Sequence, residues 1–408
     1  MIKAEMKRLV KSRQFRIVFL ISVVISMLLA YLVISFSVYP NFSDASSKRK
    51  DYRGISAVQF IKKNAESVEG EINSEFLANS FSQYREEYAK YDLEFPMEIY
   101  YRIIKPINPF LDMVWMSIYN PQKTIESIKP NEASNYYIFR KQSQKRIAED
   151  NFINNNNAYS VISKIDEKIN EPYIYQYGIG DTNATEYLSF CVFILAILCT
   201  FVSAPAFSMS YFTGEDEIVR CTKYGKKQLP TSRIVAIYLL ITILYFLTTG
   251  IFLMATIFVY GMDCSPIQIC KGALLVAPIT ENQFLMLVEL SGYLSVLAMC
   301  SFALFISSRK KNPVVSLAVS MCALLIPTIM AFVGKGGNIE TIIRILLPSG
   351  GIGFGVGMFY DVTTAWVGKF VTLFRKVLYV PNLRIIVDLC WIILFSGLTT
   401  MSYRKNVK

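Results

Sequence analysis

The sequence predicts an all-α membrane protein: six transmembrane helices, an N-terminal interfacial amphipathic helix, a mostly helical extracellular domain and a re-entrant outer helix before the last span. Three observations lead to this expectation. Apolar residues make up 53% of the 408 residues and charged residues only 18%. Several uncharged runs exceed the ~20 residues that a helix needs to cross a bilayer. Finally, the basic residues gather in a few short segments.

Residues 1–38 predict the interfacial helix and the first span. Residues 1–16 hold six bases and one acid, with apolar residues near helical spacing, which is typical of a helix on the cytoplasmic leaflet. Residues 17–38 form an uncharged run of 22 residues. A signal peptide is the alternative, but the run is long for its apolar core and no small-residue cleavage site follows. We therefore expect an uncleaved first span.

Residues 39–186 predict an extracellular domain, because the segment is polar, free of cysteine and long enough for its own core. Apolar residues recur at three- and four-residue steps from Val58 to Phe76, which predicts one amphipathic helix. Segments 132–149 and 158–169 are further helix candidates, and 173–180 is a candidate strand. Prolines are expected to interrupt the middle of the domain: Pro96, Pro106, Pro109, Pro121 and Pro130.

Residues 187–408 hold the other five expected spans, near 187–208, 234–260, 285–307, 313–333 and 385–403. The connection 261–283 carries an apolar patch, ALLVAPIT, that is too short to span and is expected at the membrane interface. Cys264 and Cys270 share this connection, and nothing else in the chain is typical of a disulfide-built protein. We therefore expect them to be unpaired.

The segment 334–384 is expected to contain the re-entrant outer element. Its uncharged part, 345–360, has 16 residues with five glycines and Pro348. As a helix it would rise ~24 Å, which is short of the ~30 Å hydrocarbon core. A broken helix that enters and leaves on one side fits this composition better than a seventh span.

The charge distribution predicts the orientation in the cell membrane. Segments 1–16, 209–233, 308–311 and 404–408 together hold 17 bases and 4 acids, so they carry +13 of a total net charge of +11. The positive-inside rule places them, and both termini, in the cytoplasm. Residues 39–186 then lie outside, and the basic balance reflects topology rather than nucleic-acid binding.

Several chemical functions are excluded by what the sequence lacks. The chain has no histidine and no GxxxxGK[ST] phosphate-binding loop, which removes histidine-based metal sites, Ser-His-Asp triads and nucleotide hydrolysis by that route. We expect no catalytic residue, no metal and no cofactor in this chain.

The charged segment 209–233 separates two of the longest uncharged runs. Its acids come first and its bases later, an order that suits the dipole of a short helix. We expect that helix to end at Pro230 and to be presented to a soluble partner. A solvated turn is the alternative, since charge runs are usually solvated.

Taken together, the layout resembles the type-two (export-class) permease subunits of ABC transporters. The resemblance lies in the basic interfacial helix, the large outer domain after the first span, and the charged loop with its acidic group, glycine and Pro-x-Ser-Arg sequence. It implies two such subunits side by side, as a homodimer or heterodimer. It also implies a separate ATPase subunit that binds ATP and magnesium and receives the loop. The implied contacts and their supports are Glu215, Asp216, Glu217, Arg220 and Tyr224, with Gly225 turning the chain, Pro230 ending the helix and Arg233 anchoring at the headgroups.

Two acids near the expected outer ends of spans, Glu289 and Asp388, are candidates for an outer vestibule or for binding a cationic substrate. The alternative is that they are ordinary interfacial acids. Gly353 and Gly357 have GxxxG spacing, which allows close helix packing or a hinge.

The sequence therefore predicts a transport subunit that exports a peptide, antibiotic, lipid or ion with ATP hydrolysed by its partner. A membrane-anchored sensor whose extracellular domain binds a ligand is the main alternative. A sensor needs a cytoplasmic output domain, however, and the longest inner segment is 209–233. A secondary transporter would be expected to show internal repeats and polar residues in mid-membrane, and neither is seen.

Overall fold

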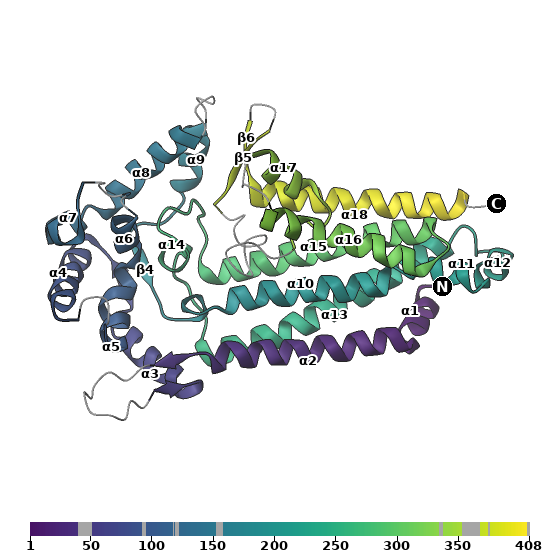
Figure 1. Ribbon diagram of the computed structural model, residues 1–408, viewed down its shortest axis with the longest axis horizontal. Helices are drawn as coiled ribbons and strands as arrows, with labels where there is room; N and C mark the ends of the chain where they lie inside the picture. The colour runs from purple at the N-terminus through teal and green to yellow at the C-terminus, as the bar shows by residue number, and fades with distance from the viewer. Residues whose placement is uncertain are drawn as a thin grey trace.

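The computed structural model shows a bundle of long apolar helices with a smaller helical domain at one end (Figure 1). It describes residues 1–39, 51–91, 95–116, 118, 122–151, 158–333, 338–352, 368–373 and 376–405. Both chain ends and the short helices α11 and α12 lie at the opposite end of the bundle from that domain. We call the domain formed by 39–186 the inserted domain, and the opposite end of the bundle the α12 end.

Among the described residues, six helices are long and apolar enough to cross a membrane, which confirms the expected number of spans. They are α2 (Arg13–Ser35), α10 (Ala184–Ser203, continuing past a kink into α11, Ser208–Phe212), α13 (Leu229–Tyr260), α15 (Glu281–Arg309), α16 (Pro313–Val333) and α18 (Val380–Lys405). The chain is thus a mostly helical, multi-pass membrane protein.

Helices α13 and α18 both begin five residues before the expected start of their spans. A proline stands in the first turn of each: Pro230 in α13 and Pro381 in α18. Proline suits that position because its missing N–H has no partner there anyway. Pro230 therefore starts the following span, and the prediction that it ends the short charged helix is wrong.

The kink between α10 and α11 follows Pro205. The backbone N–H groups of Phe207 and Ser208 donate to the hydroxyl of Ser307 at 2.9 and 3.0 Å. The hydroxyl of Ser316 donates to the carbonyl of Ala204 at 2.7 Å. Side chains of α15 and α16 thus satisfy backbone groups that the proline frees, which is the usual cause of a stable sharp bend.

Helices α10 and α15 form the centre of the bundle. Helix α10 packs against α2, α13, α15 and α16, and α15 also packs against α18. The N-terminal helix α1 (Ile2–Lys11) lies against the start of α13, with Met6 and Leu9 against the core. The amphipathic N-terminal helix is therefore confirmed as a helix.

The inserted domain has its own apolar core, centred on Phe81, Tyr84, Phe110, Tyr136 and Tyr173. Its helices are α3 (Ile55–Glu66), α4 (Ser74–Tyr91), α5 (Met97–Ile99), η1 (Tyr100–Ile104), α6 (Lys105–Trp115), η2 (Ile125–Ser127), α7 (Pro130–Ala133), α8 (Tyr136–Asn151), α9 (Ala158–Asp166) and η3 (Ile179–Asp181). Short antiparallel pairs join β1 (Val38–Tyr39) to β2 (Tyr52–Arg53) and β3 (Gly70–Ile72) to β4 (Tyr173–Tyr175).

Two sequence predictions for this domain are wrong. The helical pattern from Val58 to Phe76 is not one helix, because α3 ends at Glu66 and the chain then forms β3. Gly70 permits this break with a φ of 142°. Pro106 and Pro109 do not interrupt a helix but lie within α6, the first of them in its opening turn. The helix candidates at 132–149 and 158–169 correspond largely to α8 and α9, whereas only the first three residues of the strand candidate at 173–180 form β4.

The connection after α13 packs against both the inserted domain and the bundle. It contains the short helix α14 (Ile267–Cys270). Ile269 and Ala273 are buried in the core of the inserted domain, and Ala277 is buried in the core of the bundle. The place of this patch at the membrane interface stays a prediction. Cys264 and Cys270 are free thiols.

Before the last span, α17 (Asn338–Leu346) lies against α16 and α18 and is followed by a turn through Ile352. The hairpin β5–β6 (Phe370–Leu373 and Lys376–Tyr379) then leads into α18. Gly353 and Gly357 lie outside the described residues. The re-entrant path of 345–360 therefore stays a prediction.

Candidate functional site

The charged loop at the α12 end forms a short helix that is fixed to the last span. Helix α12 (Glu215–Arg220) begins after Gly214, whose φ of 76° is left-handed. Tyr403 of α18 donates to Asp216 Oδ1 at 2.6 Å, and Arg220 pairs with Asp216 Oδ2. The guanidinium of Arg220 lies 4.2 Å from the ring centroid of Tyr403. Asp216 and Arg220 thus hold α12 in place, and their contact with a partner stays a prediction.

Burial and charge act in opposite directions on Arg220. Burial, the largest single effect, lowers the pKa of Arg220, but Asp216, Tyr403 and Tyr211 together raise that pKa above its ordinary value. Arg220 therefore keeps its positive charge beside Asp216.

Other side chains of the same loop are exposed, and we call this set of side chains the α12 face. It presents two acids from the first turn of α12, Glu215 and Glu217, beside three exposed apolar or aromatic side chains. These are Phe212, Ile218 and Tyr224, which are 68%, 75% and 48% exposed. Exposed large apolar residues within a polar loop are typical of a protein contact surface.

Two further loop residues shape the backbone. Gly225 is buried, and a Cβ on it would lie 1.8 Å from the carbonyl oxygen of Val219. The chain passes so close to α12 there that a side chain does not fit. Arg404 of α18 donates to the carbonyl of Lys227 at 3.1 Å, so the loop is tied to the last span at a second point.

Arg233 is buried inside the bundle, only 4% exposed, and does not anchor at headgroups as predicted. It donates to the carbonyl of Ala206 at 2.9 Å, to Ser210 Oγ at 3.2 Å and to Glu5 at 3.3 Å. Glu5 also pairs with Arg8 at 2.8 Å. A buried guanidinium needs such partners, and they join α13 to the kink and to α1.

A hollow of about 300 Å³ lies between α1 and α12. Glu5, Asp216 and Arg233 line it together with Ile218 and Leu229. The structure therefore brings most of the predicted loop residues to one end of the bundle. It divides them into the exposed α12 face and a buried or partly buried set, which we call the buried frame: Asp216, Arg220, Gly225 and Arg233.

The two predicted vestibule acids are placed differently. Glu289 lies in the third turn of α15, half-buried, and accepts a hydrogen bond from Thr249 of α13. Asp388 is fully buried, accepts from Ser295 at 2.8 Å and pairs with Arg384 of its own helix. In this conformation Asp388 faces protein rather than an open space. A role for either acid in a vestibule stays a prediction.

Arg384 is a site residue that sequence reasoning missed. Its guanidinium donates to the carbonyls of Ile345, Leu347 and Pro348, the last two at 2.6 and 3.0 Å. These carbonyls end α17, where backbone acceptors have no helical partner. A base four residues before an acid, inside an otherwise apolar run, was the available signal.

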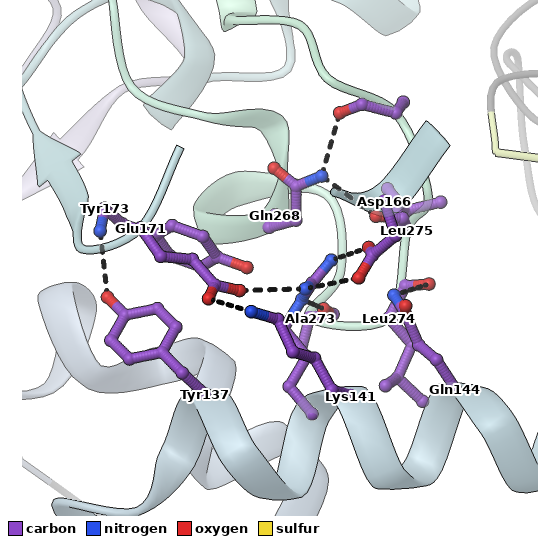
Figure 2. Close-up of polar contacts among 12 residues, drawn as sticks. Tyr137, Lys141, Gln144, Asp166, Glu171, Tyr173, Gln268, Ala273, Leu274 and Leu275 are labelled. Atoms are coloured by element: carbon purple, nitrogen blue, oxygen red, sulfur yellow. Dashed lines mark hydrogen bonds and ion pairs between the residues drawn. The ribbon is translucent and has the colours of Figure 1, made fainter. Parts of the chain in front are cut away.

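The inserted domain is joined to the connection after α13 through Arg140 of α8, which is fully buried. Arg140 pairs with both oxygens of Asp166 and donates to the carbonyl of Ala273 at 3.1 Å. Glu171 accepts from Arg140 at 3.2 Å and from Lys141 at 2.6 Å. Figure 2 shows Lys141, Asp166, Glu171 and Ala273 gathered around this point. The network makes 39–186 and the connection one packed unit.

Comparisons with known proteins give no further assignment: no protein-family model, no curated protein and no solved structure matches this chain.

Proposed function

We propose that the chain is the membrane-spanning permease subunit of an ABC transporter. In this proposal a separate ATPase subunit binds ATP and magnesium, and the chain exports a substrate such as a peptide, antibiotic, lipid or ion. A second permease subunit completes the pathway. The chain lies in the cell membrane with both termini in the cytoplasm, and 39–186 lies outside.

The single observation that supports this function best is the α12 face. A short helix carries exposed Glu215, Glu217 and Ile218 at the end of the bundle where the basic segments also gather. Acidic side chains fix the register of a contact with a basic partner surface, and apolar side chains supply its energy. A cleft in a soluble partner is the natural receptor for such a helix.

The buried frame explains how movement of a partner would reach the spans. Helix α12 is tied to α18 through Asp216, and α11 is tied to α15 through Tyr211, which donates to the carbonyl of Ser308 at 3.2 Å. Through Ser210, Arg233 connects the same loop to α13. A displacement of α12 is therefore shared among three spans, as rigid-body coupling requires.

The test is co-purification of the tagged chain from its native membranes. The double variant Glu215→Lys with Glu217→Lys reverses the exposed charges and leaves Asp216 in place. We expect it to insert normally and to lose the ATPase subunit. The matched control, Glu66→Lys with Glu75→Lys, reverses two exposed acids of the inserted domain and is expected to retain it. Equal ATPase recovery from both variants would contradict the proposed contact.

A further inference from the structure

Gly180 of the inserted domain lies between two buried acids at the junction with the bundle. Asp263 follows α13 and Glu281 begins α15, and both are fully buried. A Cβ on Gly180 would lie 2.5 Å from Asp263 Oδ2 and 2.4 Å from Glu281 Cγ. The two acids therefore pack against one backbone position, which only glycine leaves open.

The carboxyl groups lack donors among the described residues. Both carboxyl oxygens of Glu281 and Oδ2 of Asp263 have no hydrogen-bond partner there. Only Oδ1 of Asp263 is satisfied, by the backbone N–H of Ser265 at 2.7 Å. A buried carboxylate without donors is strongly disfavoured, by several kcal/mol. These atoms therefore indicate a missing positive ligand.

The neighbouring charges set how much positive charge is missing. Asp181 adds a third acid and pairs with Lys105 of α6 at 2.9 Å. Lys271 is the other nearby base, and it is half-buried. The groups that remain are neutral, because burial raises the pKa of each: Cys270, Tyr175 and Tyr177. Asp263, Glu281 and the charged groups that act on them, Asp181, Lys105 and Lys271, thus carry three negative and two positive charges, which one proton balances.

We propose that Asp263 and Glu281 form a buried proton-binding site, and that one proton held by this pair keeps the inserted domain seated on the bundle. This site goes beyond the proposed transport function and does not depend on it. A proton is the ligand that fits, because no group of three metal-ligating side chains among the described residues is placed to hold a metal ion.

Two observations agree with a proton as the ligand. Burial, and then the charge of Asp181, raise the pKa of Asp263 to about 6. A cavity of about 440 Å³ that is large enough for water is lined by Gly180, Asp181 and Lys105. The proton thus has a short route to the site.

The junction that the proton stabilises is held by backbone hydrogen bonds. The N–H of Glu281 donates to the carbonyl of Ser265 at 2.9 Å, and the N–H of Gln176 donates to Ser265 Oγ at 2.8 Å. Losing the proton places like charges on both sides of Gly180. The closed junction binds the proton more tightly than the open one, so rising pH favours opening. One proton gives at most about a tenfold change per pH unit.

The test is hydrogen exchange of the purified full-length chain in nanodiscs from pH 5.5 to 8.5, corrected for the pH dependence of the exchange chemistry. In the natural chain, protection of 176–183 and 261–283 is expected to fall by up to about tenfold per pH unit. Glu281→Gln and Asp263→Asn each supply an amide donor and remove one ionisable group, so their protection is expected to stay flat. The control Glu98→Gln, at an exposed acid, is expected to behave like the natural chain.

Three outcomes would overturn the proposal. The first is the same pH dependence in the natural chain and in both junction variants. The second is protection that is independent of pH in the natural chain. The third is protection at high pH that returns with added Ca²⁺ or Na⁺, which would make the ligand a metal ion. Exchange of α12 serves as the check that each variant is folded. If one variant fails it, the other gives the result.

Discussion

Replacement of Arg384 by alanine tests how the segment before the last span is held. The side chain is almost fully buried and makes one ion pair, with Asp388, and three hydrogen bonds to carbonyls that end α17. In the variant, Asp388 keeps only the hydroxyl of Ser295 as a donor. Stranding one partner of a buried pair costs about 3–5 kcal/mol. The carbonyls of Ile345, Leu347 and Pro348 also lose their donor, and each of them that water does not reach increases the loss of stability.

The assay is thermal unfolding of the purified chain in one detergent, with hydrogen exchange of 338–352 as a local readout. We expect Arg384→Ala to lower the unfolding temperature and to speed exchange of α17. Arg384→Met combined with Asp388→Leu removes both charges, so it should recover most of the thermal stability. It should still leave α17 loosely held. Arg384→Lys keeps the positive charge but lacks the planar guanidinium, so its unfolding temperature should lie between those of the natural chain and Arg384→Ala.

The control is Arg102→Ala in the inserted domain. Arg102 is 54% exposed and pairs with Glu98 at 3.4 Å, so its loss should cost at most about 1 kcal/mol. If Arg384→Ala lowers stability no more than this control does, the buried clamp is not a stabilising contact and the reasoning is refuted.

Three further predictions follow from the α12 end and the topology. Gly225→Ala should destabilise the loop, because its Cβ would meet the carbonyl of Val219, whereas Gly250→Ala inside α13 has open space and should be neutral or stabilising in thermal unfolding. Tyr403→Phe should release Asp216 at a cost of about 1.5–3 kcal/mol, seen as faster proteolysis of the loop. Cys264 and Cys221 are both exposed. A variant that keeps only Cys264 should react with an impermeant maleimide in intact cells, and one that keeps only Cys221 should react only after lysis. The opposite pattern would show that the proposed topology is inverted.

Much of the membrane fold follows from the sequence, because length and hydrophobicity alone decide whether a helix can span. Each of the six spans has at least one end within three residues of the expected end. The predicted ends of the spans differ from the observed helix ends where a proline starts the helix, as at Pro230, and where charged residues extend it, as at Arg404. Hydropathy does not register either effect.

The inserted domain was less predictable because its elements are short. A helix, a strand and a second helix each place an apolar residue on the core side, and from Val58 to Phe76 this imitates one helical period. Its union with the connection after α13 depends on Arg140, whose partners lie far away in the sequence. Periodicity carries no information about such contacts.

The candidate site was only partly visible in the sequence. The acidic group and Gly225 lie in one loop at the end of the bundle, as expected. The order of charges in the sequence does not distinguish the exposed acids, Glu215 and Glu217, from the buried Asp216. Asp216 is buried because Tyr403, nearly two hundred residues later, donates to it. From the sequence, Arg233 is expected at the membrane surface. In the structure it is buried, because the kink at Pro205 places the carbonyl of Ala206 within hydrogen-bond distance of it.

Position 218 gives the most direct measurement of the central claim. Ile218 of the α12 face is 75% exposed, so a photo-crosslinking amino acid there should not disturb the buried frame. After irradiation of intact cells, the account predicts a crosslink to a P-loop ATPase that is lost in the Glu215→Lys, Glu217→Lys background. The same probe at Met254, 68% exposed on α13, should give no such crosslink. A folded chain that captures no ATPase from position 218, or captures it equally from position 254, would contradict the proposed function.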